Sequence, residues 1–371
     1  MVSAVTIATI VRSESTFDAA LARESFRGNL SPRARFQEIT RTPDPESTRP
    51  TMATIAELPQ TLTELLICPC CHSDIQELAG EMRCSNPGCS IAFPKVDDVP
   101  ILLNEQQSLF EASLFLEHRP TFFKPVGRLR ALVSGLLPAV SDNLAADRVL
   151  GQMRDLLVAE QERPRVLVLG GGILGAGMEQ LASDPRIQLV ETDVSLAERT
   201  QLICDGHHLP FRDATFDGVI VQAVLEHVLD PRRCVDEIER VLKERGLVYA
   251  DTPFMQQVHG REFDFTRFTS LGHRRLMRNF TELRSGISGG PGAALVWALR
   301  YFVLSFFIST TARRVAGGVT RIAFGWLKYF DRFLQHRPGA LDAASAFYFL
   351  GRKSKVPLDD RALIASYRGG F

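Results

Sequence analysis

Two groups of residues in this sequence have types and spacings suited to binding chemistry. The first is a glycine-rich turn, Gly170-Gly171-Gly172 with Gly175, which directly follows an apolar run at 166–169. Glycines at the end of a buried strand let a ligand approach the backbone closely, beside the N-terminus of the next helix. An ordinary tight turn of an α/β sheet would use the same residues.

Acidic residues follow the next two apolar runs. Asp193 comes after the run at 187–190, and Asp205 comes after the run at 202–204. The first carboxylate can accept hydrogen bonds from two ribose hydroxyls, and the second can accept one from the exocyclic amine of adenine. The glycine pattern G-x-G-x-x-G suits a nicotinamide or flavin dinucleotide as well as S-adenosylmethionine. The candidate cofactor-binding residues are Gly170, Gly171, Gly172, Gly175, Asp193, Asp205, Gly206 and Gln222.

The second group is a cluster of cysteines, because five of the seven fall within residues 68–89. Cys68 and Cys71 form a C-x-x-C pair, and Cys84 and Cys89 form a second pair with four residues between them. Two such pairs supply four thiolates, the ligand set of a tetrahedral structural zinc ion. Incidental cysteines are the alternative, and Cys70 is a spare thiol that could compete for the metal.

The hydrophobic pattern predicts the elements that position these residues. Apolar runs alternate with amphipathic segments, a pattern typical of a parallel α/β sheet covered by helices. Strands are expected at 166–169, 187–190, 202–204, 216–221, 246–250, 282–287 and 345–350, and helices at about 174–182, from about 225–227 and at 235–242. Short strands are expected at 75–78, 81–83 and 91–93, where a metal would be the main stabiliser of so small a unit.

Residues 160–287, and again the C-terminus, resemble the class I S-adenosylmethionine-dependent methyltransferases of the type-11 sort. The resemblance is carried by Gly170-Gly171-Gly172, Asp193, Asp205 with Leu209-Pro210-Phe211, Phe216-Asp217 and Leu225-Glu226-His227. It implies a Rossmann-like sheet with helices on both faces, an antiparallel last strand, and methyl transfer from S-adenosylmethionine. The alternatives are an NAD(P)-dependent oxidoreductase and a non-catalytic methyltransferase-like scaffold. Val168 departs from the family, because many members have an acid there.

Residues 65–103 resemble the short zinc-ribbon family whose members activate tRNA and protein methyltransferases. The closing motif Phe-Pro-x-x-Asp-x-Val-Pro-x-Leu-Leu is part of this resemblance. It implies a small zinc ribbon fused to the methyltransferase domain, and it concerns the fold more than the activity.

The acceptor side has fewer signals. His227, His259 and Asp264 are the candidates for catalysis, although His227, expected at the start of a helix, would more often be a structural hydrogen bonder. Methyl transfer from a sulfonium depends on in-line positioning, and a base is needed only when the nucleophile is a hydroxyl or a weakly acidic carbon. Stretches similar to 259–280 occur in methyltransferases of cell-surface glycan biosynthesis. The expected acceptor is therefore a small molecule or a lipid-linked glycan precursor.

An apolar segment interrupted by arginines occupies residues 288–343, before the last strand. Its longest uncharged stretch, 301–312, is too short to span a bilayer. Helices lying on a membrane, a lipid-substrate pocket and an oligomer interface all fit this composition, and a helical cap with its own small core is the alternative. We expect a cytoplasmic protein with possible peripheral contact at the membrane face.

The chain is thus divided into a disordered tail (1–51), a zinc ribbon (52–104), a helical connector (105–160) and a methyltransferase domain (161–371). The 43 basic and 43 acidic side chains balance, so the net charge gives no signal for nucleic-acid binding.

Overall fold

The computed structural model describes residues 63–78, 80–121 and 139–370. Every described residue belongs to one compact unit of the chain. The predicted disordered tail (1–51) lies outside the described residues, as does the part of the predicted connector from 122 to 138.

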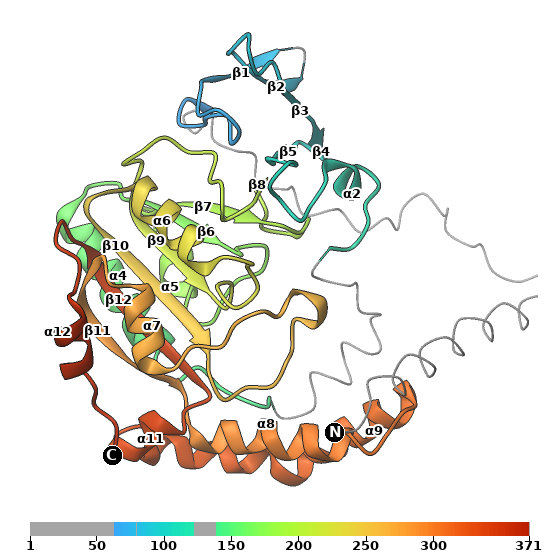
Figure 1. Ribbon diagram of the computed structural model, residues 1–371, viewed down its shortest axis with the longest axis vertical. Helices are drawn as coiled ribbons and strands as arrows, with labels where there is room; N and C mark the ends of the chain where they lie inside the picture. Colours follow the sequence, from blue (N-terminus) through green and yellow to red (C-terminus); the bar gives the residue numbers. More distant parts are fainter. Residues whose placement is uncertain (1–62, 79, 122–138, 371) are drawn as a thin grey trace, which may run out of the picture. The chain divides into compact units, whose positions relative to one another are not determined.

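Nine strands of the described chain form one sheet, in the order β11-β12-β10-β9-β6-β7-β8-β5-β4 (Figure 1). The strands of its centre run parallel, whereas β12 is antiparallel to both β10 and β11. This arrangement confirms the predicted Rossmann-like α/β class with an antiparallel last strand. The bounds are β6 Arg165–Leu169, β7 Gln188–Asp193, β8 Leu202–Cys204, β9 Phe216–Gln222, β10 Leu242–Pro253, β11 Phe280–Gly289 and β12 Ala346–Lys353.

Both faces of β6 are buried, because successive side chains point to opposite sides of a strand. Val166 and Val168 pack in the core that contains the apolar face of α4 (Ala146–Glu160). Leu167 and Leu169 pack in the core that contains α6 (Pro231–Val241). The helices therefore cover both faces of the sheet and hold the strand ends, where the glycine turn begins, in fixed positions.

The predicted helix at 174–182 is much shorter than expected. Only α5 (Glu179–Ala182) is helical, and Gly177 has a left-handed backbone with φ of +76°. A residue in this conformation ends a right-handed helical path. The glycine turn therefore continues as a loop, and the expected helix N-terminus does not lie directly beside it.

The predicted start of a helix near 225–227 is also wrong. Residues 224–229 form turns, and α6 begins at Pro231. The side chain of Asp230 accepts hydrogen bonds from the amides of Arg232 and Arg233, and proline is favoured in the first turn. This cap fixes the start of the helix and leaves His227 in a turn.

The cysteine segment forms a three-stranded antiparallel sheet of β1 (Ile75–Leu78), β2 (Glu81–Cys84) and β3 (Ala92–Phe93). The chain then continues through β4 (Lys95–Val96) into β5 (Val99–Leu102), which pairs in parallel with β8 of the main sheet. A backbone hydrogen bond of 3.0 Å from Ile67 N to Pro210 O adds a second connection. The cysteine segment is thus joined to the main sheet through backbone pairing.

The predicted helical insertion lies between β11 and β12, and its helices occupy residues 291–342. Both carboxylate oxygens of Asp331 accept hydrogen bonds from the first amides of α8, which ties the start of α10 to the start of α8. The bounds are α8 Pro291–Leu304, α9 Thr310–Phe324, η2 Gly325–Phe330, α10 Asp331–Leu334 and α11 Pro338–Asp342. The other short helices are α2 Ala112–Leu116, η1 Arg261–Phe263, α7 Ser270–Leu276 and α12 Asp360–Ala365.

Candidate active site

The ends of β6, β7, β8 and β9 border a cavity of about 500 Å³. Most of the predicted cofactor-binding residues line it, which brings together four separate strand ends. They are Gly170, Gly175, Asp193, Asp205, Gly206 and Gln222. Gly171 and Gly172 do not line the cavity; the backbone amide of Gly172 instead donates a hydrogen bond of 2.9 Å to Asp193 Oδ2.

The glycine turn has no room for larger side chains. Gly170 has a φ of +72°, and a Cβ atom there would lie 2.5 Å from Cγ2 of Val224. A Cβ atom on Gly175 would lie 2.3 Å from Oε1 of Gln222. Gly170 therefore requires glycine for its backbone conformation, whereas a side chain at position 175 would have to displace the amide of Gln222.

Asp193 is buried at the end of β7, with 6% of its surface exposed. Burial raises the pKa of its carboxyl to about 6, although the amides of Gly172, Val194 and Ser195 donate to it and partly offset that shift. The carboxylate is therefore ionised at neutral pH and placed at the cavity wall, as the binding of ribose hydroxyls requires.

Asp205 is equally buried but differently supported. Ser108 Oγ donates to Oδ2 at 2.6 Å, and the amide of His207 donates to Oδ1 at 3.0 Å. Burial alone would raise the pKa of Asp205, but the hydrogen bonds from His207 and Ser108 outweigh it and hold the pKa below its ordinary value. Asp205 is consequently a persistent anion at the second predicted cofactor position.

Part of the cavity wall comes from segments that the sequence did not identify. Gln107, Leu109 and Phe110 of the connector line the cavity, together with Phe263 of η1. The rings of Phe110 and Phe263 stack with centroids 5.5 Å apart. These residues are far apart in the sequence and have no local motif, so the sequence carried no signal for them.

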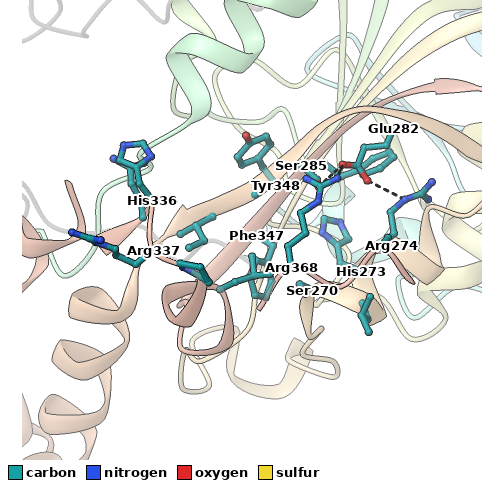
Figure 2. Close-up of a pocket in the computed structure, with 18 residues that line it drawn as sticks. Ser270, His273, Arg274, Glu282, Ser285, His336, Arg337, Phe347, Tyr348 and Arg368 are labelled. Carbon is teal, nitrogen blue, oxygen red and sulfur yellow. Dashed lines mark hydrogen bonds and ion pairs between the residues drawn. The ribbon is translucent and has the colours of Figure 1, made fainter. Parts of the chain in front are cut away.

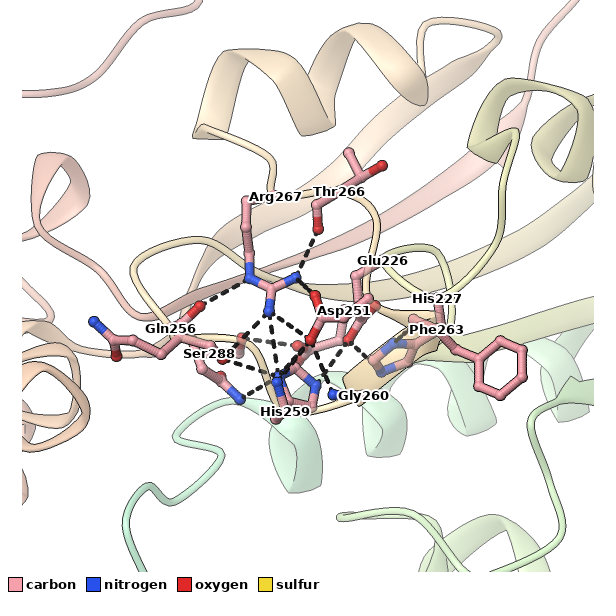
Figure 3. A network of polar contacts seen from close by, with 12 residues as sticks. Glu226, His227, Asp251, Gln256, His259, Gly260, Phe263, Thr266, Arg267 and Ser288 are labelled. Carbon is pink, nitrogen blue, oxygen red and sulfur yellow. Dashed lines mark hydrogen bonds and ion pairs between the residues drawn. The ribbon is translucent and has the colours of Figure 1, made fainter. Parts of the chain in front are cut away.

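A polar network surrounds Glu226 beside the same cavity (Figure 3). Glu226 is completely buried, and its Oε1 lies 3.6 Å from His227 Nε2 and 3.7 Å from His259 Nε2. The Glu226 carbonyl accepts hydrogen bonds from the amides of Phe265 and Thr266, which brings the 259–266 loop against the turn after β9. His227 and His259 line the cavity, so two of the three predicted catalytic candidates reach it.

Asp264, the third candidate, does not line the cavity. Its Oδ2 accepts hydrogen bonds from the amides of His259 (2.7 Å) and Gly260 (2.9 Å), and Arg267 pairs with both carboxylate oxygens. Burial opposes ionisation, but these donors outweigh it and hold the pKa of Asp264 well below its usual range. The geometry makes Asp264 an anchor for the loop and not a base.

A second cavity, of about 280 Å³, lies at the β11 and β12 end of the sheet (Figure 2). Glu282 bridges two arginines there, at 3.2 Å from Arg274 Nε and 2.9 Å from Arg368 Nη2. None of the predicted site residues lines this cavity. Two of its three arginines, Arg274 and Arg368, therefore already have a carboxylate partner within the wall.

The four predicted zinc ligands converge. The sulfur atoms of Cys68 and Cys89 lie 3.8 Å apart, and those of Cys71 and Cys84 lie 3.4 Å apart. All four ligand atoms lie within 4.8 Å of one another. Sulfurs bound tetrahedrally to zinc at about 2.3 Å are about 3.8 Å apart, so the cluster fits the ion. Cys70 does not belong to this group.

Fold and cavity together define an α/β domain with a cavity at the ends of parallel strands, where the predicted cofactor-binding residues gather. Residues 169–250 match the model of a family described as a methyltransferase domain. The predicted resemblance to a methyltransferase domain is therefore confirmed for this part of the chain.

Among known proteins, demethylmenaquinone methyltransferase of Clavibacter sepedonicus is 35% identical over 77 residues, which are 21% of this chain and 26% of that protein. This chain spans 23% to 48% of the length of the three curated relatives that it matches. Phosphoethanolamine N-methyltransferase 2 of Haemonchus contortus, in complex with S-adenosyl-L-methionine, is similar at a TM-score of 0.36 and 16% identity, over 57% of this chain and 54% of that chain. A chain of the complex between the Haloferax volcanii methyltransferase activator Trm112 and a methyltransferase is similar at a TM-score of 0.35 and 18% identity, over 58% of this chain and 100% of that chain.

Proposed function

We propose that this protein transfers the methyl group of S-adenosylmethionine to an acceptor that enters the cavity at the ends of β6–β9. The observation that carries the proposal is the convergence of two buried carboxylates, Asp193 and Asp205, on one cavity with the glycine turn. Bound there, S-adenosylmethionine would supply an electrophilic methyl group on a sulfonium.

The residues of the cavity have distinct parts in this proposal. Asp193 accepts the ribose hydroxyls, and Asp205 accepts from the adenine amine. Gln222 presents an amide oxygen that has no hydrogen-bond donor among the described residues, so it can accept from the amino group at the other end of the cofactor. The walls exclude water and hold the methyl carbon in line with the acceptor, the factor on which this reaction most depends.

Calorimetric titration tests the cofactor. We expect S-adenosylmethionine and S-adenosylhomocysteine to bind the full chain with a stoichiometry of one, and NAD and NADP not to bind. Tight binding of a nicotinamide dinucleotide would favour the oxidoreductase alternative. The absence of any nucleoside ligand would favour the non-catalytic scaffold.

The acceptor is tested by methyl transfer from labelled S-adenosylmethionine to cell extract separated into lipid, glycan, RNA and protein fractions. We propose a lipid-linked acceptor, such as a cell-surface glycan precursor, with a free small molecule as the alternative. The support is the contact between the insertion and the active-site loop: the ring of Trp297 in α8 lies 6.2 Å from that of His259. Label confined to RNA or protein would reject this acceptor class.

We also propose that the insertion docks peripherally on a membrane. In α9, the small residues Ala316, Gly317 and Thr320 are buried, whereas Val315 and Val319 point outward. A helix that buries its small residues and exposes its large apolar ones presents a surface for another partner. The exposed apolar residues of the insertion are Leu295, Phe302, Phe306, Phe307, Ile308, Val315, Val319, Ile322, Trp326, Tyr329, Phe330, Phe333 and Leu334.

Exposed Arg313 and Arg314 flank this surface and would favour anionic lipid. Lys328, in contrast, is buried and pairs with Asp142 at 2.7 Å, so it does not contribute to the surface. None of the described helices combines the length and apolar character needed to cross a bilayer. The proposed contact is therefore with the membrane surface.

Sedimentation with anionic liposomes tests the docking. The double variant Phe306→Glu and Ile308→Glu places charge at side chains that are 71% and 100% exposed, and we expect most of the sedimentation to be lost. Val356→Glu, at a 77% exposed position outside the insertion, is the matched control. Wild-type protein that stays in the supernatant at low salt would reject the membrane surface.

A further inference from the structure

We propose that Glu226, His227 and His259 bind a divalent transition-metal ion at the wall of the cofactor cavity. The ligand atoms are one carboxylate oxygen and the Nε2 atoms of the two imidazoles, and all three lie within 4.8 Å of one another. Neighbouring ligands of an ion bound at about 2.1 Å lie about 3.0–3.4 Å apart. The observed separations of 3.6 and 3.7 Å from Glu226 Oε1 require a contraction of only a few tenths of an ångström.

The environment of Glu226 is the independent observation that points to a cation. Its side chain is 0% exposed, and among the described residues no hydrogen-bond donor reaches either carboxylate oxygen. An ionised carboxylate without donors is very costly to bury, so it requires a positive partner. Arg267, the arginine of this network, pairs with Asp264, and its Nη2 also lies 3.4 Å from Nδ1 of His259.

The hydrogen bond of His227 decides which of its nitrogens faces this carboxylate. Its Nδ1 lies 2.6 Å from the carbonyl oxygen of Phe263, which can only accept, so Nδ1 carries the proton. In the neutral ring, Nε2 then presents a lone pair toward Glu226. Two facing lone pairs repel each other, and a metal ion between them turns that repulsion into coordination.

The atoms behind the ring of His259 include acceptors and a donor. Its Nδ1 lies 3.4 Å from the carbonyl of Gln257, 3.6 Å from Oδ2 of Asp264 and 3.4 Å from Nη2 of Arg267. The amide of Gln256 also lies 3.2 Å away, and rotating that amide by 180° would present its oxygen as a third acceptor. An acceptor behind the ring is the usual outer shell of a histidine ligand, and the carbonyl of Phe263 fills that place for His227. Two imidazoles and one carboxylate suit manganese, iron, nickel or zinc better than magnesium or calcium.

The position of the ion indicates an acceptor class, an inference that rests on the proposed methyl transfer. Because His227 and His259 line the cavity together with Gln222 and Gly175, an acceptor oxygen entering it can complete the coordination shell. A hydroxyl bound to a metal ion loses its proton to solvent more easily than a free hydroxyl does. The resulting oxygen forms a bond to the methyl carbon while the carbon–sulfur bond breaks, and that electron pair stays on sulfur. The geometry therefore favours a hydroxyl-bearing acceptor.

The test is a titration of manganese(II) into the full, zinc-containing chain, followed by electron paramagnetic resonance. We expect one saturable site, weakened at least ten-fold in Glu226→Gln and in His259→Ala. His336→Ala is the matched control, because this exposed histidine lies outside the network, and it should bind manganese as the wild type does. Circular dichroism and zinc content establish that each variant is folded.

A measurement on the wild type does not depend on the variants. Bound manganese should broaden the ring signals of two of the chain's eight histidines far more than those of the other six. No saturable site in the wild type, or unchanged binding in both ligand variants, would overturn the proposal. Binding of S-adenosylmethionine is measured in parallel by calorimetry. If the cofactor binds and manganese does not, the metal site fails and the methyltransferase proposal stands. If manganese binds and the cofactor does not, the methyltransferase proposal fails and the metal site stands.

Discussion

Asp193 and Asp205 are both buried at strand ends, yet their surroundings shift the two pKa values in opposite directions. Asp193 has backbone amides as its donors, and burial raises its pKa to about 6. At Asp205, burial is outweighed by His207 and Ser108, and the pKa is lowered. Only Asp193 can therefore change its charge near the lower end of the physiological pH range.

Replacing Asp193 should affect both binding and folding. Charge-assisted hydrogen bonds contribute roughly 1.5–3 kcal/mol, so Asp193→Ala should weaken S-adenosylmethionine binding by about ten-fold to more than a hundred-fold. The side chain of Asp193 is also buried and accepts a hydrogen bond from Gly172 N. Loss of that acceptor should lower the free energy of unfolding by about 1–3 kcal/mol.

Calorimetry and urea unfolding measure the two effects of Asp193→Ala. Glu198→Ala, at an exposed position on the following loop, is the control and should change neither quantity. Wild-type affinity in Asp193→Ala would contradict the assignment of this residue to the ribose.

The affinity for S-adenosylmethionine should also depend on pH. Because ionised Asp193 is the better acceptor and its pKa is about 6, affinity should rise about ten-fold from pH 5 to pH 7. The contribution of Asp193 to the stability of the empty protein has the opposite sign. Its folded pKa exceeds the unfolded value of about 3.9, so that contribution falls as the pH rises from about 4 to 6.

Titrations at several pH values check this prediction. Asp193→Asn, which does not ionise, should bind more weakly and show a flat profile over the same range. A wild-type profile as flat as that of Asp193→Asn would show that another group controls binding.

At the scale of elements, local patterns predicted the strands well and the site only in part. The runs that became β6–β9 are apolar and end in glycine or acid, so their ends could be read directly from the sequence. The length of α5 was not predicted, because the helical pattern at 174–182 competes with the left-handed Gly177. Ser108, Phe110 and Phe263 reach the cavity only through tertiary packing, which no local spacing records.

The cysteine segment should depend on its metal. Cys84→Ser should remove one equivalent of zinc per chain, because its sulfur belongs to the four-thiolate cluster. Since β5 follows this segment and Ser108 supports Asp205, we also expect weaker cofactor binding. Cys70→Ser is the matched control, because this thiol lies outside the cluster.

Metal analysis and calorimetry measure the two quantities in Cys84→Ser. Full zinc content in this variant would disprove the ligand assignment. Zinc loss with unchanged cofactor affinity would disprove the coupling alone.

At the scale of the whole molecule, the backbone pairing of β5 with β8 joins the cysteine segment to the methyltransferase-like sheet. We therefore expect the two parts to unfold together, in a single transition by differential scanning calorimetry. Chelation of zinc should lower the temperature of that transition and should not produce a separate early one. Two well-resolved transitions in the zinc-loaded protein would show that the parts are energetically independent.

The same pairing also bears on how the protein avoids aggregation. Without β5, strand β8, which precedes Asp205, would lie at the margin of the sheet. The backbone groups of Ile203 and Cys204 would then be unpaired on one side of an apolar strand that is otherwise buried. Such margins template the addition of strands from other molecules. The strand that follows the cysteine segment, β5, thus shields the sheet. We therefore expect a newly made chain that has not acquired zinc to be the species most exposed to mispairing with its own copies.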